Sequence, residues 1–336
     1  CNSLDARILT LTQIGIKAIS PSIEIVTPAP PGSLHGNRMT ALRWEQFLKK
    51  LGFLVRISES WSGNKTDLLI ALHALRSHQS INLFKKAFPE KPIILIVTGT
   101  DLYRDMETHS EVHKSMEIAD AIVVLQSAAV HSIPKDQRFK THVIYQSIKS
   151  IKRKALLRKS FLVSVIGHLR PEKDPFCSAR ALGLLPDESH IRVIHLGKAM
   201  SEEMREQAVT YSAQLKRYEW LDECSHKETL NQLSRCHLMV ISSFMEGGAH
   251  VVSEAIAVGI PVIASDIAGN RGLLGDDYPG YFPVGNEIEL AKLLVQAETN
   301  LDFYKSLERH IQARKKYVLP EFEMQSIRKL VNSLLK

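Results

Sequence analysis

The chain has 336 residues, 44% of them hydrophobic and 24% charged, with a formal net charge of +7. This composition is typical of a globular protein long enough for two domains of about 150 residues, and it excludes a disordered chain. No apolar run approaches the roughly 18 residues of a transmembrane helix, so no contact with a membrane is expected. The four cysteines form no C-x-x-C pair, which favours reduced thiols and a cytoplasmic protein.

The chain begins with an extension over residues 1–20, to which no role is assigned. A short β-branched strand is predicted over residues 23–28, followed by the loop PAPPGSLHGNR and a helix over about 37–51. A loop between a strand and a helix start is a candidate anion site, and a structural turn with solvated arginines is the alternative. The loop lacks a G-x-G-x-x-G fingerprint, so NAD is not inferred. The candidate binding residues here are Gly32, His35, Asn37 and Arg38.

Strands and helices alternate up to about residue 145, which predicts a parallel sheet with helices on both faces over residues 21–148. The motif TGTDLYRD follows the strand expected over residues 93–98. Thr100 and Asp101 therefore fall at the carboxyl edge of the sheet, where α/β proteins bind ligands. Asp101 also suits a simple helix cap. The basic run QSIKSIKRKALLRKS that follows is interpreted as a domain connection with a solvated face.

A second α/β domain is predicted over residues 149–318, and it opens with a strand over 161–166 and the loop GHLRPEKDP. Gly167 lets a ligand approach the backbone, and the cations Arg170 and Lys173 are able to neutralise a diphosphate leaving group without a metal. A surface loop with solvated cations is the alternative interpretation.

The stretch VISSFMEGGAHVVSEAIAVGIPVIASDIAGNRGLL is the centre of the second domain and is predicted to form strand, glycine turn, helix, strand and loop. Gly247, Gly248 and Ala249 lead into the helix start, which favours a phosphate. Glu246 lies in the turn and Glu254 follows eight residues later, so both are expected to face the crevice above the strand ends. Each carboxylate has a plainer interpretation as an acid that offsets the helix dipole.

These motifs resemble those of nucleotide-sugar glycosyltransferases with the GT-B fold, in which two Rossmann-like, doubly wound domains face each other across a cleft. Glu246 and Glu254 match the E-x7-E signature, and residues 167–173 match the G-x-L-x-x-x-K loop. The resemblance implies that Glu246 meets the transferred sugar, that Glu254 meets the ribose, and that the backbone at Leu221 meets the base. It also implies that a helix over residues 319–336 returns to the first domain.

The resemblance assigns catalysis to three side chains and nucleotide-sugar binding to nine residues. One departure is the loop AGNRGLL, where many GT-B enzymes have an acid and this chain has Arg271. An added cation suits a doubly anionic acceptor, and a solvated loop arginine is the alternative. The implied catalytic residues are Arg170, Lys173 and Glu246. The implied nucleotide-sugar site comprises Gly167, Arg170, Lys173, Leu221, Glu246, Gly247, Gly248, Ala249 and Glu254.

A narrower resemblance is carried by VTPAPPGSLHGNRMTALRW, TGTDLYRD, VIYQS, GHLRPEKDP, EGGAHVVSEA and DYPGYFPVG. These segments resemble selenosugar synthases of selenoneine biosynthesis. The resemblance implies transfer of N-acetylglucosamine or glucose from a UDP-sugar to selenophosphate, with no metal and no cofactor. The acceptor is then expected in the first domain, at Gly32, His35, Asn37, Arg38, Thr100 and Asp101. An oxygen or thiol acceptor, a nucleotide-sugar sensor without turnover, and a nucleic-acid binder suggested by the positive charge are the alternatives.

Overall fold

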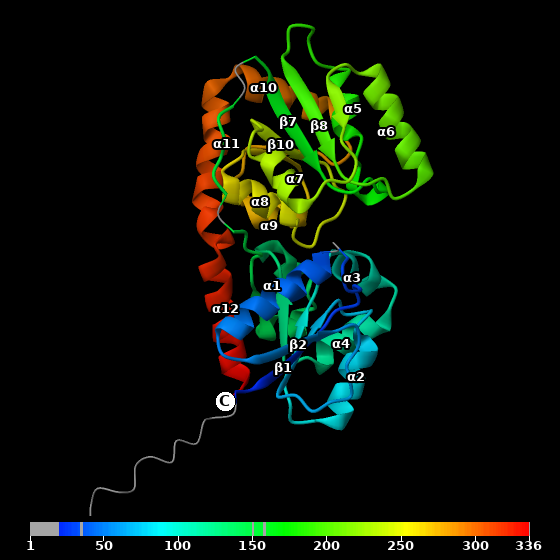
Figure 1. The fold of residues 1–336 in the computed structure, drawn as a ribbon, viewed down its shortest axis with the longest axis vertical. Helices are drawn as coiled ribbons and strands as arrows, with labels where there is room; N and C mark the ends of the chain where they lie inside the picture. Colours follow the sequence, from blue (N-terminus) through cyan, green and yellow to red (C-terminus); the bar gives the residue numbers. More distant parts are fainter. Residues whose placement is uncertain (1–19, 34–35, 150, 157–158, 336) are drawn as a thin grey trace, which may run out of the picture.

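The computed structural model describes residues 20–33, 36–149, 151–156 and 159–335, which form two lobes (Figure 1). Each lobe is built on a six-stranded sheet, and every strand pair in both sheets is parallel. Helices lie between most successive strands, because a parallel pair needs a crossover connection. The predicted α/β fold with two doubly wound domains is confirmed.

The first domain has the strand order β2-β1-β3-β4-β5-β6. Its inner strands are buried along their whole length, which accounts for their unbroken apolar sequences such as LLIAL and IILI. The order reverses between β1 and β3, so the loops that leave these two strands diverge and open a crevice. The strands are β1 (Ser22–Val26), β2 (Leu54–Ser58), β3 (Leu68–Leu72), β4 (Ile93–Ile96), β5 (Ala121–Val124) and β6 (Thr141–Val143). The helices are α1 (Gly36–Lys50), α2 (His78–Ala87), α3 (Gly99–Tyr103) and α4 (Ser110–Ile118).

The second domain has the order β12-β11-β10-β7-β8-β9, and its direction reverses between β7 and β10. The two central motifs predicted from the sequence follow these two strands, so both lie at the switch point. The strands are β7 (Phe161–Ile166), β8 (Ile191–Leu196), β9 (Tyr218–Trp220), β10 (Leu238–Ile241), β11 (Val262–Ser265) and β12 (Tyr281–Phe282). The helices are α5 (Cys177–Leu182), α6 (Glu202–Gln214), α7 (His226–Leu233), α8 (His250–Val258), α9 (Ala268–Leu274), α10 (Glu287–Thr299) and α11 (Leu301–Arg314).

The segment AGNRGLL was expected to be a loop, and this expectation is wrong because it forms helix α9. Its glycines serve close packing instead of a turn. A Cβ on Gly269 would overlap the backbone of Glu246, and a Cβ on Gly272 would overlap the side chain of Gln126 from the first domain. Because these two positions of α9 carry no side chain, the helix fits between the turn that holds Glu246 and the first domain.

The last helix, α12 (Pro320–Leu334), crosses from the second domain and lies beside α1 of the first (Figure 1). Ile327, Leu330 and Val331 enter the apolar core that β1, β3, β4 and α1 share. The carboxylate of Glu323, only 1% exposed, accepts hydrogen bonds from Arg43 Nε at 2.9 Å and from Trp44 Nε1 at 3.0 Å. It also accepts one at 2.7 Å from the backbone N–H of Ser147, in the connection between the domains.

The two domains touch through backbone at the carboxyl ends of their sheets. A Cβ placed on Gly99, at the start of α3, would lie 2.7 Å from the backbone nitrogen of Gly247. A Cβ on Gly248 would lie 2.7 Å from the Cβ of Leu125, which follows β5. Because real Cβ atoms do not approach other atoms this closely, glycine at these positions allows the two loops to meet.

Candidate active site

The loop after β7 carries both predicted leaving-group cations and is held by the strand beside it. Residues Pro171–Lys173 form a short 3-10 turn. The hydroxyl of Ser242, at the end of β10, donates to the carbonyl of Lys173 at 3.1 Å and to that of Asp174 at 2.8 Å. The N–H of Phe244 donates to the carbonyl of Glu172 at 2.9 Å. The loop and the turn that holds Glu246 therefore form one fixed unit.

Within this unit, Lys173 and Glu246 form an ion pair. The same Oε1 of Glu246 accepts a hydrogen bond from the Ser243 hydroxyl at 2.7 Å. The Lys173 side chain is 33% exposed and that of Glu246 is 11% exposed, so solvent reaches the pair mainly through the lysine. Arg170, three residues before Lys173, is 34% exposed and lies 3.8 Å from the Glu172 carboxylate. Both predicted cations are thus available to a ligand.

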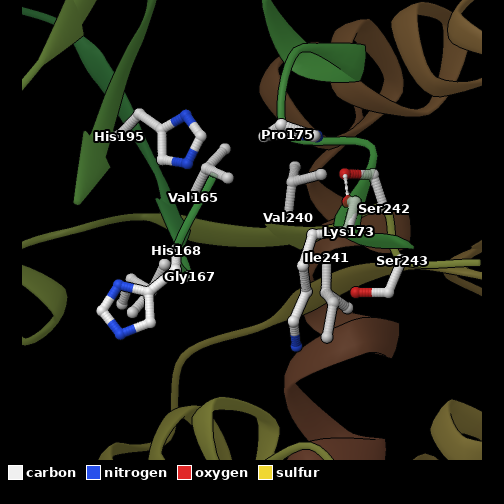
Figure 2. Close-up of a pocket in the computed structure, with 11 residues that line it drawn as sticks. Val165, Gly167, His168, Lys173, Pro175, His195, Val240, Ile241, Ser242 and Ser243 are labelled. Carbon is white, nitrogen blue, oxygen red and sulfur yellow. Dashed lines mark hydrogen bonds between the residues drawn. The ribbon is translucent and has the colours of Figure 1, made fainter. Parts of the chain in front are cut away.

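A small pocket lies above the ends of β7 and β10 (Figure 2). Figure 2 shows the Lys173 side chain extended past Ile241, with Gly167 and His168 on one side and Ser242 and Ser243 on the other. Gly167 therefore lines the pocket, and its contact with a nucleotide-sugar stays a prediction. Its carbonyl packs so closely against Gly197 that a Cβ on Gly197 would overlap it.

The turn Gly247, Gly248 and Ala249 leads directly into α8, and no side chain caps this helix. The N–H of Val252 donates to the carbonyl of Ala249 at 2.9 Å, so the N–H groups of His250 and Val251, ahead of it, are the ones placed to bind an anion together with the positive end of the helix dipole. The helix ends at Gly259, which takes the left-handed conformation with φ 86°.

Glu254 lies one turn into α8 and is 2% exposed. Its Oε1 accepts from His226 Nε2 at 2.7 Å and lies 3.2 Å from His250 Nδ1. Burial raises the pKa of Glu254, but the hydrogen bonds from the two histidines outweigh burial and lower it to about 2. The same contact raises the pKa of His226. Neither histidine was predicted from the sequence as a partner of Glu254, although the i,i+4 spacing of His250 and Glu254 indicates a contact on one helix face.

Leu221 directly follows β9, which ends at Trp220. Its N–H donates to the carbonyl of His195 at 2.8 Å, so the chain stays beside β8 as it leaves the sheet. His195 is fully buried, and burial lowers its pKa to about 4. Leu221 thus lies at the carboxyl edge of the second sheet, the same edge as Gly167.

The first domain places its predicted acceptor residues along the matching edge of its own sheet. Gly32 has φ 80° in the loop after β1, and Asn37 and Arg38 lie in the first turn of α1, partly exposed. His35 lies outside the described residues. Thr100 is partly exposed in α3, after β4.

Asp101 differs from the other predicted acceptor residues because it is fully buried. Its carboxylate accepts from the backbone N–H of Thr98 and that of Ala74, both at 2.7 Å, and from the Thr98 hydroxyl at 2.8 Å. It therefore ties the loop after β4 to the loop after β3. The structure gives Asp101 the capping role that the sequence left as an alternative.

Three buried polar atoms around the β1–α1 loop have no hydrogen-bond partner among the described residues: Thr27 Oγ1, Ser33 Oγ and Arg38 Nε. Buried polar groups are nearly always satisfied, so these three atoms make the loop a candidate site for a polar ligand or water. Arg271, in contrast, is already neutralised. Its guanidinium bonds Asp266 at 2.5 and 2.9 Å and lies over the ring of Tyr281.

Comparison with known proteins decides the family. Residues 147–317, about half of the chain, match the family described as "Glycosyl transferases group 1". The chain belongs to this family. A galactosyltransferase from Escherichia coli, UDP-Gal:alpha-D-GlcNAc-diphosphoundecaprenol alpha-1,3-galactosyltransferase, is 27% identical over 141 residues. That match covers 40% of this chain and spans only about a third (35%) of the relative's own length.

Solved structures with the same fold match nearly the whole chain. Anabaena HepE in complex with UDP and glucose is 15% identical with a TM-score of 0.70, covering 93% of this chain and 100% of HepE. Sucrose-phosphate synthase from Thermosynechococcus elongatus is 13% identical with a TM-score of 0.76, covering 94% and 99%. At such low identity these similarities establish the fold alone.

Two further observations concern membranes and metals. No helix in the described part of the chain is long and apolar enough to cross a bilayer. Among the same residues, no group of three or more His, Cys, Asp or Glu side chains is placed to hold a metal ion. The expectation of catalysis without a metal stays a prediction, and it rests on the placement of Arg170 and Lys173.

Proposed function

We propose that this protein is a UDP-sugar-dependent glycosyltransferase that transfers N-acetylglucosamine or glucose to selenophosphate, giving a 1-seleno-sugar for selenoneine biosynthesis. The donor half of the proposal rests on one arrangement. The loop that bears Arg170 and Lys173 and the turn that bears Glu246 flank the switch point of the second sheet, where nucleotides bind in this fold class. Family membership and the UDP named in the HepE structure support the choice of nucleotide.

The donor is expected to lie with its diphosphate between the two cations and the free N–H groups of α8. Glu246 then faces the hexose, and Glu254 faces the ribose. Because Oε1 of Glu254 is occupied by two histidines, its other oxygen is the one left for a ribose hydroxyl. The base is expected beside Leu221, at the outer strands of the same edge.

The acceptor half rests on the first domain. Selenophosphate is small, highly charged and nearly without apolar surface, so its site must consist of N–H groups, hydroxyls and cations. The unpartnered atoms of Thr27, Ser33 and Arg38 supply such groups at the switch point of the first sheet. The contact between Gly99 and Gly247 brings that edge against the donor site.

In the proposed reaction the selenium atom attacks C1 of the hexose while the bond from C1 to the UDP oxygen breaks. Arg170 and Lys173 stabilise the charge that develops on the departing diphosphate. Water then attacks phosphorus and the P–Se bond breaks, which releases phosphate and the seleno-sugar. UDP, phosphate and the seleno-sugar account for all atoms of donor, acceptor and water.

The test is an anaerobic incubation of the protein with UDP-N-acetylglucosamine or UDP-glucose and selenophosphate, a thiol or a sugar hydroxyl, with products identified by mass spectrometry. The proposal expects UDP release and a seleno-sugar only with selenophosphate. A thioglycoside or an O-glycoside would retain the transferase and overturn the acceptor. UDP binding without UDP release would indicate a sensor, and RNA or DNA binding that ignores UDP would indicate a nucleic-acid binder.

Arg38→Ala tests the acceptor site separately from the donor site. It should raise the apparent KM for selenophosphate about 10- to 100-fold, since a charged hydrogen bond contributes roughly 1.5–3 kcal/mol. The affinity for UDP should stay within about a factor of three, because Arg38 belongs to the other domain. An unchanged selenophosphate dependence would remove Arg38 from the site.

A further inference from the structure

His73 is a buried histidine that the proposed reaction does not use. It directly follows β3, one of the two strands at the switch point of the first sheet. It is 1% exposed, and its φ of 74° is in the left-handed region, which is uncommon for residues other than glycine, although asparagine, aspartate and histidine are enriched there. Backbone strain at the carboxyl edge of a sheet points to a role for the side chain.

The contacts of the ring favour one tautomer. The backbone N–H of Arg76 donates to Nδ1 at 3.4 Å, which favours an unprotonated Nδ1, and Asp101 Oδ2 lies farther from this nitrogen, at 3.9 Å. Nε2 lies 3.0 Å from the hydroxyl oxygen of Thr100. Burial lowers the pKa of His73 more than the nearby carboxylates of Asp101 and Asp105 raise it, so the ring is neutral at pH 7. The single ring proton is then on Nε2, which donates to Thr100.

This assignment determines what the Thr100 hydroxyl does. Its oxygen accepts from His73, which leaves its own proton for another partner. Within the described residues, no protein acceptor takes this proton. Thr100 is partly exposed and adjoins Gly99, the residue that touches Gly247 of the donor domain. A donor hydroxyl is thus placed where the two halves of the proposed site meet.

We infer that His73 is a positioning residue that holds the Thr100 hydroxyl as a hydrogen-bond donor toward an oxyanion of the bound acceptor, an inference that rests on the proposed function. The surroundings keep the arrangement rigid. Asp101 bonds the N–H of Ala74, next to His73, and the N–H of Thr98 on the Thr100 side. The ring and the hydroxyl are therefore fixed relative to each other before any ligand binds.

The first experiment is a nitrogen–proton NMR correlation on the full chain, with His73 assigned by comparison with His73→Asn. The inference expects a neutral ring protonated on Nε2 at pH 7. A ring protonated on Nδ1, or a doubly protonated ring, would overturn it whatever the enzyme's activity.

The second experiment measures UDP release against acceptor concentration in four proteins: wild type, Thr100→Val, His73→Asn and the double variant. Asparagine tolerates positive φ, so His73→Asn preserves the backbone. Each single variant should lower kcat/KM for the acceptor roughly five- to tenfold, with UDP affinity within about a factor of two. If His73 acts only through Thr100, the double variant should lose no more than Thr100→Val alone. Thr100→Ser should restore most of the activity.

The outcomes separate this inference from the proposed function. If the double variant loses the product of the two single losses, or if Thr100→Val retains full activity, only the role of His73 and Thr100 is overturned. If the wild type releases no UDP from either UDP-sugar, the proposed function fails and the positioning role fails with it. Thermal unfolding of all four proteins identifies any variant that has lost its fold, and His73→Gln then replaces His73→Asn.

Discussion

Lys173 and Glu246 form an ion pair between the loop after β7 and the turn after β10. The pair joins a cation proposed to act on the leaving group to a carboxylate proposed to meet the hexose. A diphosphate that binds Lys173 competes with Glu246 for the ammonium group. Binding of the donor is therefore expected to release the Glu246 carboxylate for the sugar hydroxyls, which couples recognition of the two parts of the donor.

Removing either cation should impair turnover while the fold survives. Arg170→Ala and Lys173→Ala should each lower kcat about 10²–10³-fold, as expected when a preorganised charge on a developing anion is lost. Both side chains are about one-third exposed, so neither supports the core. Lys292→Ala, an exposed lysine on α10, is the matched control and should be silent. Near-normal turnover in a folded double variant would refute the leaving-group role.

The two glutamates should separate nucleotide binding from sugar binding. Glu254→Ala should weaken both UDP and UDP-sugar by roughly 1.5–3 kcal/mol, the contribution of a charged hydrogen bond. Glu246→Ala should weaken the UDP-sugar more than UDP. Isothermal titration calorimetry with both ligands measures the difference, and equal losses of UDP affinity in the two variants would contradict this division.

The contact between His226 and Glu254 should make stability depend on pH. The pKa of His226 is raised above 6.5, so its contribution is complete below pH 6.5 and is lost as the pH rises through the raised value. The pKa of Glu254 is lowered from 4.5 to about 2, so its contribution is complete above pH 4.5 and is lost as the pH falls toward 2. Unfolding by urea should therefore be hardest between these limits.

The variant His226→Gln checks the histidine side of this window. It should flatten the fall in unfolding free energy as the pH rises above 6.5, whereas His113→Gln, on the surface of α4, should leave that fall in place. His250 also faces Glu254 and is kept in both variants. A wild-type slope that persists in His226→Gln would show that another group titrates there.

The glycine contact between the domains predicts a steric effect on turnover. Gly99→Ala would place a methyl group 2.7 Å from the Gly247 nitrogen, so the two loops would have to separate. Turnover should fall at least about tenfold, since an ångström of misplacement at a reacting centre costs up to 10²-fold. Gly183→Ala, exposed and only in ordinary contact at 3.4 Å, is the control. UDP binding should persist in both, and full activity in Gly99→Ala would show that the contact is dispensable.

The buried carboxylate of Glu323 should dominate the stability of the helix that joins the domains. Glu323→Ala leaves Arg43, the Trp44 N–H and the Ser147 N–H without their acceptor, and should destabilise the protein by about 3–5 kcal/mol. Glu321→Ala, exposed on the same helix turn, should change the unfolding free energy by less than about 0.5 kcal/mol. Urea unfolding followed by circular dichroism measures the unfolding free energy of both variants. Similar losses in the two would show that the hydrogen bonds to Glu323 contribute little to stability.

The sequence predicted the parts of the site that depend on one segment at a time. The strand-turn-helix around Glu246 and Glu254 and the loop with Arg170 and Lys173 each have a local pattern, and the parallel fold then brings them to one edge. It did not predict His226 as a partner of Glu254, because a contact between residues 28 apart in separate helices leaves no local signal. His73 was missed for the same reason, since its importance comes from β4 lying beside β3.

Arg271 is a different case, because the sequence left open whether it serves the acceptor or is a solvated loop arginine. Asp266 and Asp276 approach the guanidinium once α9 forms. Asp101 similarly looked like a ligand-binding acid, and its carboxylate is used up by backbone N–H groups. In both cases hydrogen-bond satisfaction, which only the folded chain reveals, decides the role.

The path of α12 has a consequence for how the protein is made. The ribosome delivers the first domain before the second, yet Ile327, Leu330 and Val331 of its apolar core follow the whole second domain in the chain. Domains usually fold in the order in which they emerge, and here the earlier one must wait with an open groove along α1 while the later one assembles. During that interval the nascent first domain exposes apolar surface around Trp44, which is the kind of surface that chaperones bind.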